Sequence, residues 1–267
     1  MDIGLLERKF ALMGARVQFR EIAGAHRWRP QRPGIDIRWD AKGEFFDVRL
    51  ARDERVEYEV VDLRAEMRHL LLLGRNGGRK EKYLCGHDER HWFVCAVPGA
   101  SVSGVLSAME SLQPAIVRRA VSVKLRRRKD RFRRRNEAFV RQGEWFFLPV
   151  PNLAVPERLV LRNEPLSRGA GSKPHMCQFV YRTGGTSVWV CWKYPRGVLA
   201  AEYAKIVAED PKASRWNWRR MVRDPEFYAR GRVWHRDHKT VVLDGWHRVV
   251  MNTEREAPFA PRVVFLD

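Results

Sequence analysis

Short strand-like segments separated by turn residues recur along the chain between residues 16 and 98. In the segment of residues 56–63, Val56, Tyr58 and Val60 alternate with charged neighbours, and this period of two is typical of a strand with one buried face. The triplets Ala41-Lys42-Gly43 and Asn76-Gly77-Gly78 separate similar segments and predict two hairpins. We therefore expect a mainly antiparallel sheet, with strands at residues 16–22, 35–39, 44–50, 56–63, 69–73, 81–85 and 91–97.

Helical spacing marks other parts of the chain. Ile3, Leu6, Phe10 and Met13 recur every three or four residues, which predicts a short helix over residues 2–14. Further helices are expected over residues 101–112, from Pro114 to about residue 141, and over 198–209 and 215–223. Residues 62–73 could form a helix capped by Asp62 instead of strands.

Two glycine dipeptides predict hairpins in the second half of the chain. One hairpin is expected around Gly184-Gly185 and the other around Asp244-Gly245. The predicted fold class is α+β, with mainly antiparallel β-hairpins and sheets in two lobes that a long basic α-helix links. The expected parts are a β-rich lobe over 1–98, a helical segment over 99–141 and an α+β lobe over 142–267.

The charge of the chain indicates an acidic partner. The 267 residues include 51 Lys and Arg against 32 Asp and Glu, so the formal net charge is +19. Apolar residues make up 45% of the chain, which excludes a wholly disordered protein, because disorder needs low hydrophobicity beside high net charge. A basic protein with a core is typical of those that bind nucleic acid, an anionic membrane surface or an acidic protein.

The densest positive charge lies in the helix expected after Pro114. Apolar residues between Val117 and Phe139 lie four or seven residues apart, so one face of this helix would be apolar. The other face would contact phosphates. Its basic residues are Arg118, Arg119, Lys124, Arg126, Arg127, Arg128, Lys129, Arg131, Arg133, Arg134 and Arg135. The alternative is a solvated face or an interdomain linker.

Tryptophan alternates with arginine in two places. Trp216 and Trp218 are followed by Arg219 and Arg220, and Trp28 lies between two arginines. Exposed Trp beside Arg stacks unpaired bases, so this composition favours single strands or RNA loops. Two Trp residues two positions apart do not share one narrow stripe of a helix, so we expect one near the surface. The alternative is that these Trp residues belong to the core.

A turn between Cys85 and His91 contains residue types that bind metals. If residues 86–90 form a loop, Cys85 lies opposite His91 and His87 lies between them, and the three would bind Zn²⁺ or another divalent ion. His87, Asp88 and His91 are also the candidate catalytic residues, since imidazole and carboxylate groups in a short turn suit acid–base chemistry. The alternative is a polar tight turn beside a buried cysteine.

A second set of metal ligands is His175, His235 and His238. His235 and His238 are three residues apart, and His175 would reach them only if their strands were neighbours. The alternative is a group of hydrogen-bonded histidines at a sheet edge.

No targeting or membrane segment is evident in the sequence. No apolar run approaches the roughly 20 residues of a spanning helix, and Met1–Gly4 does not begin a basic stretch followed by an apolar block. The four cysteines are too few and too scattered for a disulfide framework. We therefore expect a cytoplasmic protein with free thiols and no membrane span.

The leading functional hypothesis is a protein that binds RNA or DNA, alone or within a larger nucleoprotein assembly. One alternative is a metal-dependent nuclease, or another enzyme acting on nucleic acid, that uses a His/Asp cluster. A second alternative is a structural protein that docks on an acidic partner. The same basic surface would serve all three, so charge leaves open whether the chain is an enzyme.

Overall fold

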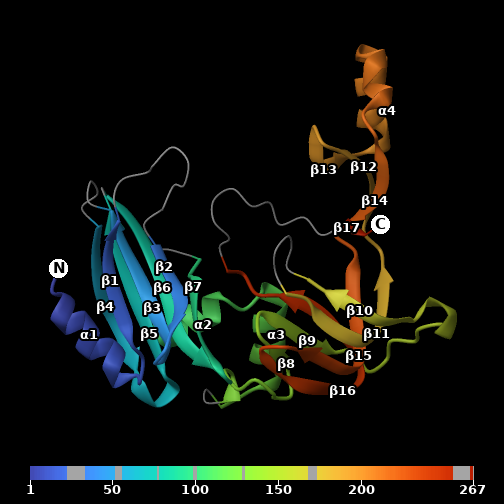
Figure 1. Ribbon diagram of the computed structural model, residues 1–267. Coiled ribbons are helices and arrows are strands. Elements are labelled where there is room, and N and C mark those ends of the chain that lie inside the picture. Colours follow the sequence, from blue (N-terminus) through green and yellow to red (C-terminus); the bar gives the residue numbers. More distant parts are fainter. Residues whose placement is uncertain are drawn as a thin grey trace. The chain divides into compact units, whose positions relative to one another are not determined.

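The computed structural model describes residues 1–22, 34–51, 56–76, 78–98, 101–127, 130–167, 173–254 and 265–266, and Figure 1 shows its ribbon. Its strands form four sheets. The chain divides into two compact units, the first consisting mainly of Met1–Arg133 and the second mainly of Arg134–Arg236 and Thr240–Met251.

The first unit begins with α1 (Ile3–Leu12), which confirms the helix predicted there. The carboxylate of Asp2 caps this helix by accepting a hydrogen bond from the Leu5 amide at 2.9 Å. A three-stranded sheet follows, in the order β1-β3-β2. Its strands are β1 (Val17–Ile22), β2 (Gly34–Asp40) and β3 (Gly43–Ala51). The β2–β3 pair is the hairpin predicted around Ala41-Lys42-Gly43, whereas β1 runs parallel to β3.

An antiparallel sheet of four strands completes the β-structure of this unit. Its strands are β4 (Val56–Arg64), β5 (His69–Asn76), β6 (Arg79–Asp88) and β7 (His91–Ala96), paired in chain order. The single turn of 3₁₀ helix η1 (Ala65–Met67) joins β4 to β5, so the alternative helix over residues 62–73 is wrong. The hairpin predicted between residues 69 and 85 is confirmed by the pairing of β5 with β6.

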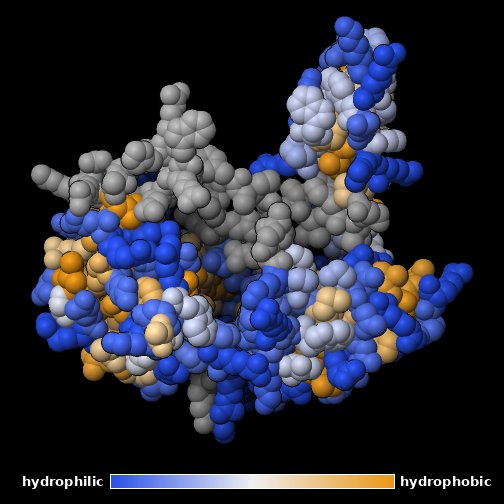
Figure 2. Space-filling model, in the orientation of Figure 1, coloured by the Kyte–Doolittle hydropathy of each residue, from blue (hydrophilic) through white to orange (hydrophobic). Residues whose placement is uncertain are grey.

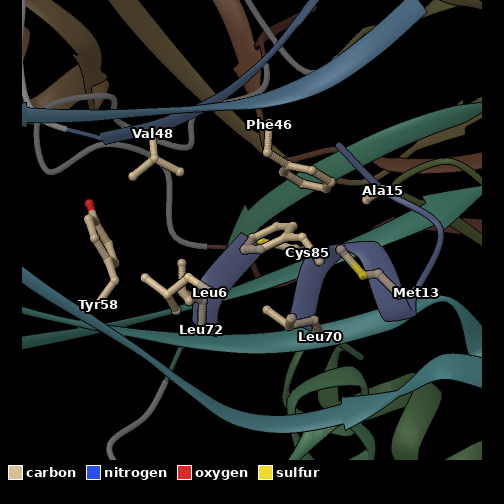
Figure 3. Packing of buried hydrophobic residues seen from close by; sticks show 10 residues of the cluster. Leu6, Met13, Ala15, Phe46, Val48, Tyr58, Leu70, Leu72 and Cys85 are labelled. Atoms are coloured by element: carbon tan, nitrogen blue, oxygen red, sulfur yellow. The ribbon is translucent and has the colours of Figure 1, made fainter. Parts of the chain in front are cut away.

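The leucine run of β5 is buried because this strand has a covered face on each side. Leu70 and Leu72 belong to a core shared by α1, β3 and β6, which Figure 3 shows from close by. Leu71 points the other way, into a second cluster that contains Val105 and Met109 of α2 (Val105–Ser111). A strand covered on both faces has a continuous apolar run instead of an alternating one.

The long basic helix is the main error of the sequence interpretation. The helix α3 (Ala115–Lys124) follows Pro114 as predicted, but it ends at Lys124, and Leu125 is already extended. In a longer helix, arginines four residues apart would lie side by side and repel one another. In the shorter helix, the dipole stabilises basic residues that lie at its carboxyl end. The apolar stripe is therefore helical only as far as Val121, although Leu125 and Phe139 are also buried.

The second unit contains a six-stranded sheet in the order β10-β11-β15-β16-β9-β8. Its strands are β8 (Val140–Gln142), β9 (Trp145–Pro149), β10 (Leu161–Leu166), β11 (His175–Thr183), β15 (Glu226–His235) and β16 (His238–Met251). One turn of 3₁₀ helix, η3 (Glu157–Leu159), precedes β10. The core of this sheet includes Phe147, Cys177, Val180, Ala229 and Val233, which are all fully buried.

A smaller sheet continues two of these strands. Its order is β13-β12-β14-β17, and its strands are β12 (Thr186–Cys191), β13 (Tyr194–Val198), β14 (Arg219–Arg223) and β17 (Phe265–Leu266). The helix α4 (Ala200–Glu209), which is predicted from the sequence, and the 3₁₀ helix η4 (Pro211–Arg215) lie between β13 and β14. Because β11 pairs with β15 and β12 with β14, these four strands form one long two-stranded ribbon, called the ribbon below.

Three predictions in this unit are wrong. Gly184-Gly185 is the joint between β11 and β12, which do not pair with each other. Asp244-Gly245 lies inside β16, which runs through it as a single strand. Residues 215–223 are not helical, because η4 gives way to the strand β14. In each case pairing with a strand distant in sequence outweighs the local signal.

The fold class predicted from the sequence is therefore corrected. The described residues are mostly β, with four short α-helices, α1 to α4, and they contain no long helix that links two lobes. Within this described part of the chain, no helix combines the length and apolar character that crossing a membrane requires.

Candidate functional site

The first predicted cluster, around Cys85, is not assembled. In the β6–β7 hairpin His87 lies opposite Trp92, and Asp88 lies opposite His91, so His87 and His91 belong to different faces. Cys85 lies opposite Val94 and is fully buried, and burial raises the pKa of its thiol. The predicted pairing of Cys85 with His91 is therefore wrong, because the hairpin turn is shorter than the assumed loop.

The other side chains of that cluster have structural contacts. His91 Nδ1 lies 2.8 Å from a carboxylate oxygen of Glu44, and the other oxygen of Glu44 accepts a hydrogen bond from the Trp92 amide. The ring of His87 packs edge-on against Trp92. The two contacts of Glu44 tie the β6–β7 turn to β3, so His91 helps to hold the two sheets of the first unit together, whereas the contact of His87 stays within the hairpin.

The predicted basic residues lie partly on α3 and partly on the irregular chain that follows it. Exposed side chains come from both parts. They are Arg118, Arg119, Lys124, Arg126, Arg127, Arg133 and Arg135. Arg131 and Arg134 are half-buried, and burial, with a smaller contribution from Arg141, lowers the pKa of Arg134 to about 10. Arg128, Lys129 and the Trp28 cluster lie outside the described residues.

The second predicted histidine set does come together. His175 begins β11, His235 ends β15, and the pairing of Met176 with Trp234 places these two histidines side by side. Their rings stack with centroids 4.3 Å apart and planes 20° apart. His238 begins β16, and one ligand atom from each of the three histidines lies within 4.8 Å of the others.

A group of aromatic rings with one exposed member lies on the smaller sheet of the second unit. We define the aromatic platform as Trp192, Tyr194, Trp216 and Trp218. The rings of Tyr194, Trp216 and Trp218 are stacked, with planes 18° to 24° apart and centroids 5.6 to 6.4 Å apart. Trp192 adjoins Trp216 at 6.5 Å and is 74% exposed. Part of the ring surface of the platform therefore remains accessible to solvent.

A local backbone conformation brings Trp216 and Trp218 to the same side. Asn217 between them has a φ of 53°, in the left-handed region that asparagine tolerates better than most residues. The Trp218 indole N–H donates to the carbonyl of Ala213 at 2.8 Å, which fixes that ring against η4. The expectation that one of these Trp residues lies near the surface was based on a helix; both lie instead in this turn, and both are half-buried.

The inner edge of the platform is the small core of this sheet. Trp189 of β12 stacks on Tyr203 of α4 at 4.7 Å, and Tyr203 meets Trp218 edge-on at 5.1 Å. No residue of α4 is buried, so these ring contacts supply much of what holds the helix to the sheet. The structural role thus falls to Trp189 and Tyr203, and Trp192 lies at the opposite, outer edge.

Positive charge surrounds the platform. Lys193 places its ammonium nitrogen 3.7 Å from the centroid of the Trp216 ring, a cation–π contact. Arg219 and Arg220 follow Trp218 and are exposed. Residues 186–223 contain eight Lys or Arg against three Asp or Glu. Figure 2 shows residues of intermediate hydropathy beside strongly hydrophilic ones over α4 and the adjoining sheet.

Sequence analysis named Trp216, Trp218, Arg219 and Arg220 but missed the β12–β13 turn. The missing residues are Trp192, Lys193 and Tyr194. The available signal was the alternation of aromatic and basic residues in Trp-Lys-Tyr, the same pattern that singled out the other two clusters.

Comparison of the chain with known protein families, curated proteins and solved structures finds no match.

Proposed function

We propose that this protein binds single-stranded nucleic acid on the aromatic platform. The observation that carries the proposal is the row of stacked rings of Tyr194, Trp216 and Trp218, which adjoins the tilted and exposed ring of Trp192 and has the Lys193 ammonium over Trp216. Aromatic side chains with accessible ring faces are the usual binding surface for unpaired bases, and each stacked base contributes about 1–3 kcal/mol.

The charge around the rings supports a polyanionic ligand. Lys193, Arg219 and Arg220 border the platform, and guanidinium groups bind phosphate oxygens in a bidentate manner. The guanidinium of Arg220 already has a partner within the protein, because its Nε donates a hydrogen bond to the hydroxyl of Ser187 at 3.0 Å. Arg219 is the better candidate for a phosphate contact, since it is exposed on the next position of β14.

The platform favours a single strand over a duplex. Bases in a duplex stack on each other and expose only their edges, so a flat ring surface has little to bind there. Recognition by stacking also tolerates any base, because every base has a π-face. We therefore expect weak sequence preference and a strong dependence of the affinity on salt concentration.

The decisive experiment is a fluorescence anisotropy titration with short labelled single-stranded DNA and RNA, compared with a duplex. Trp192→Ala is expected to lower the affinity for single strands by about 5- to 150-fold, which corresponds to the loss of one stacked base. The matched control is Trp39→Ala, because Trp39 is also an exposed tryptophan, at 66%, but lies in the first unit. An equal loss in both variants, or wild-type binding no stronger to single strands than to duplex, contradicts the proposal.

A second pair of variants tests the turn that aligns the rings. Asn217→Gly keeps access to a positive φ and should retain binding, whereas Asn217→Val should weaken it, because β-branched residues strongly disfavour that region. The melting temperature of each variant separates a binding defect from unfolding. Equal affinities of the Gly and Val variants would show that alignment of Trp216 with Trp218 is unimportant.

A further inference from the structure

Three histidines meet at one end of the six-stranded sheet. His175, His235 and His238 come from the neighbouring strands β11, β15 and β16, so backbone pairing fixes where their side chains start. His175 is only 1% exposed, while His235 and His238 are half-buried. The cluster is therefore formed on rigid elements and stays accessible from one side.

The spacing of these imidazoles is close to that of metal ligands. Two nitrogens bound to one tetrahedral ion at about 2.0–2.1 Å lie about 3.4 Å apart. The three ligand atoms lie within 4.8 Å of one another, so each pair has to approach by no more than about 1.4 Å to reach that spacing.

We propose that His175, His235 and His238 bind one divalent transition-metal ion of the zinc class. Imidazole nitrogen suits Zn²⁺, Cu²⁺, Ni²⁺ and Fe²⁺, whereas Mg²⁺ and Ca²⁺ prefer oxygen ligands. The sulfur of Cys177 does not join the group, although it lies two residues beyond His175. Cys177 is fully buried in the core of the six-stranded sheet, among Val180, Ala229 and Val233.

The proposed site has one coordination position left for a small ligand. Among the described residues, the group that could hold an ion has only three members. Three protein ligands with the fourth position open to water or an anion is the arrangement of zinc sites that react, whereas structural sites are usually closed by four ligands. The site therefore fits a metal-bound water or a small anionic ligand better than a purely structural ion.

The proposal is independent of the aromatic platform, because the two sets of residues do not overlap. Metal-free protein should still bind oligonucleotides, and Trp192→Ala should still bind metal. Failure of either proposal is thus recognised without reference to the other.

The test uses the full chain, freed of metal by dialysis against a chelator and then titrated with Co²⁺ and Zn²⁺. Wild-type protein should bind one Co²⁺ per chain with the visible absorption of a tetrahedral site, and Zn²⁺ should displace it. His235→Ala and His238→Ala should each lower Zn²⁺ affinity by more than about 100-fold, beyond the 10- to 100-fold typical of changes outside the ligand shell. These half-buried positions are chosen because the buried His175 is a greater risk to folding.

The matched control is His91→Ala, another half-buried histidine, which also belongs to the first predicted metal set. It should keep stoichiometric, tight binding. A second measurement is the melting temperature, which Zn²⁺ should raise in the wild type and in His91→Ala but not in His235→Ala or His238→Ala. Substoichiometric Co²⁺, the absence of a tetrahedral spectrum, or equal Zn²⁺ affinity in His235→Ala and wild type overturns the proposal.

Discussion

The glycine pair at the joint of the ribbon allows a sharp test of how the smaller sheet is held. Gly184 and Gly185 both have positive φ values, 66° and 85°. A Cβ added to Gly184 would meet nothing within 4 Å. A Cβ added to Gly185 would lie 2.6 Å from a methyl carbon of Val222 and 2.9 Å from the carbonyl oxygen of Arg223. An alanine at either position would thus have a strained backbone, but only at Gly185 would its Cβ collide with neighbouring atoms.

The expected magnitudes follow from that difference. Gly184→Ala should cost only the strain of a left-handed alanine, about 1–2 kcal/mol. Gly185→Ala should add the cost of overpacking, about 1–3 kcal/mol, because Val222 is short and stiff and the Arg223 carbonyl belongs to β14. The neighbouring backbone is therefore forced to move in one variant and not in the other.

Amide hydrogen exchange in β12 and β14 measures this directly. Each 1.4 kcal/mol of lost local stability speeds exchange about tenfold, so Gly185→Ala should exchange roughly tenfold faster than Gly184→Ala. The exchange of β4 and β5 in the first unit provides the internal reference. Equal rates in β12 for the two variants, or faster exchange in Gly184→Ala, would refute the argument from close approach.

Three further measurements follow from other contacts. Asp47→Asn should lower the free energy of unfolding in urea by about 1–3 kcal/mol, because this buried carboxylate accepts a hydrogen bond from Arg20 Nε at 2.6 Å; an unchanged midpoint would contradict that. Burial raises the pKa of Cys177 from its ordinary 9.0 to about 12, so the unfolded chain loses this proton at a lower pH than the folded protein does. The free energy of unfolding should therefore fall as the pH rises from 9 towards 12. Cys177→Ala should make this fall smaller, as measured by urea unfolding at several pH values. Arg219→Gln should leave the melting temperature unchanged but reduce the slope of log affinity against log salt by about 0.7 if Arg219 contacts one phosphate of a single strand, and an unchanged slope would remove Arg219 from the binding surface.

The parts of the fold that follow from sequence are those whose partners are close along the chain. The helix α1 and the two hairpins of the first unit depend on local spacing and on turn triplets, and they are predicted correctly. The parallel pairing of β1 with β3 has no such signal, because its register depends on residues about thirty positions apart.

Turn dipeptides misled the interpretation of the second unit for a physical reason. Asp-Gly and Gly-Gly permit a tight turn but do not enforce one. Gly245 has open space around it and lies within the extended β16, so no turn is needed there. Gly185 has the positive φ that a turn would use, but it serves the close approach of β12 to β14 instead. Sequence alone does not show which use a glycine has.

For the candidate sites, too, the sequence shows which residue types are present but not which of them come together in space. The residue types of the platform and of the histidine cluster are visible in the sequence, but neither assembly is local. His175 reaches His235 only because β11 pairs with β15, a contact between residues sixty positions apart. The Cys85 set, which is compact in sequence, is separated by strand alternation within a short turn. Proximity along the chain was thus the weaker guide to a site.

Both candidate sites depend on the ribbon, and this makes their failures informative. The pairing of β11 with β15 brings His175 to His235 at one end, and the pairing of β12 with β14 positions Trp189 and Trp218 near the other. A variant that disrupts the joint, such as Gly185→Ala, acts on the support of the platform while leaving the register at Met176 and Trp234 intact. It should therefore weaken oligonucleotide binding and spare metal binding. Loss of both together would mean that the ribbon folds as one cooperative unit, so that neither site can be perturbed through the backbone without the other.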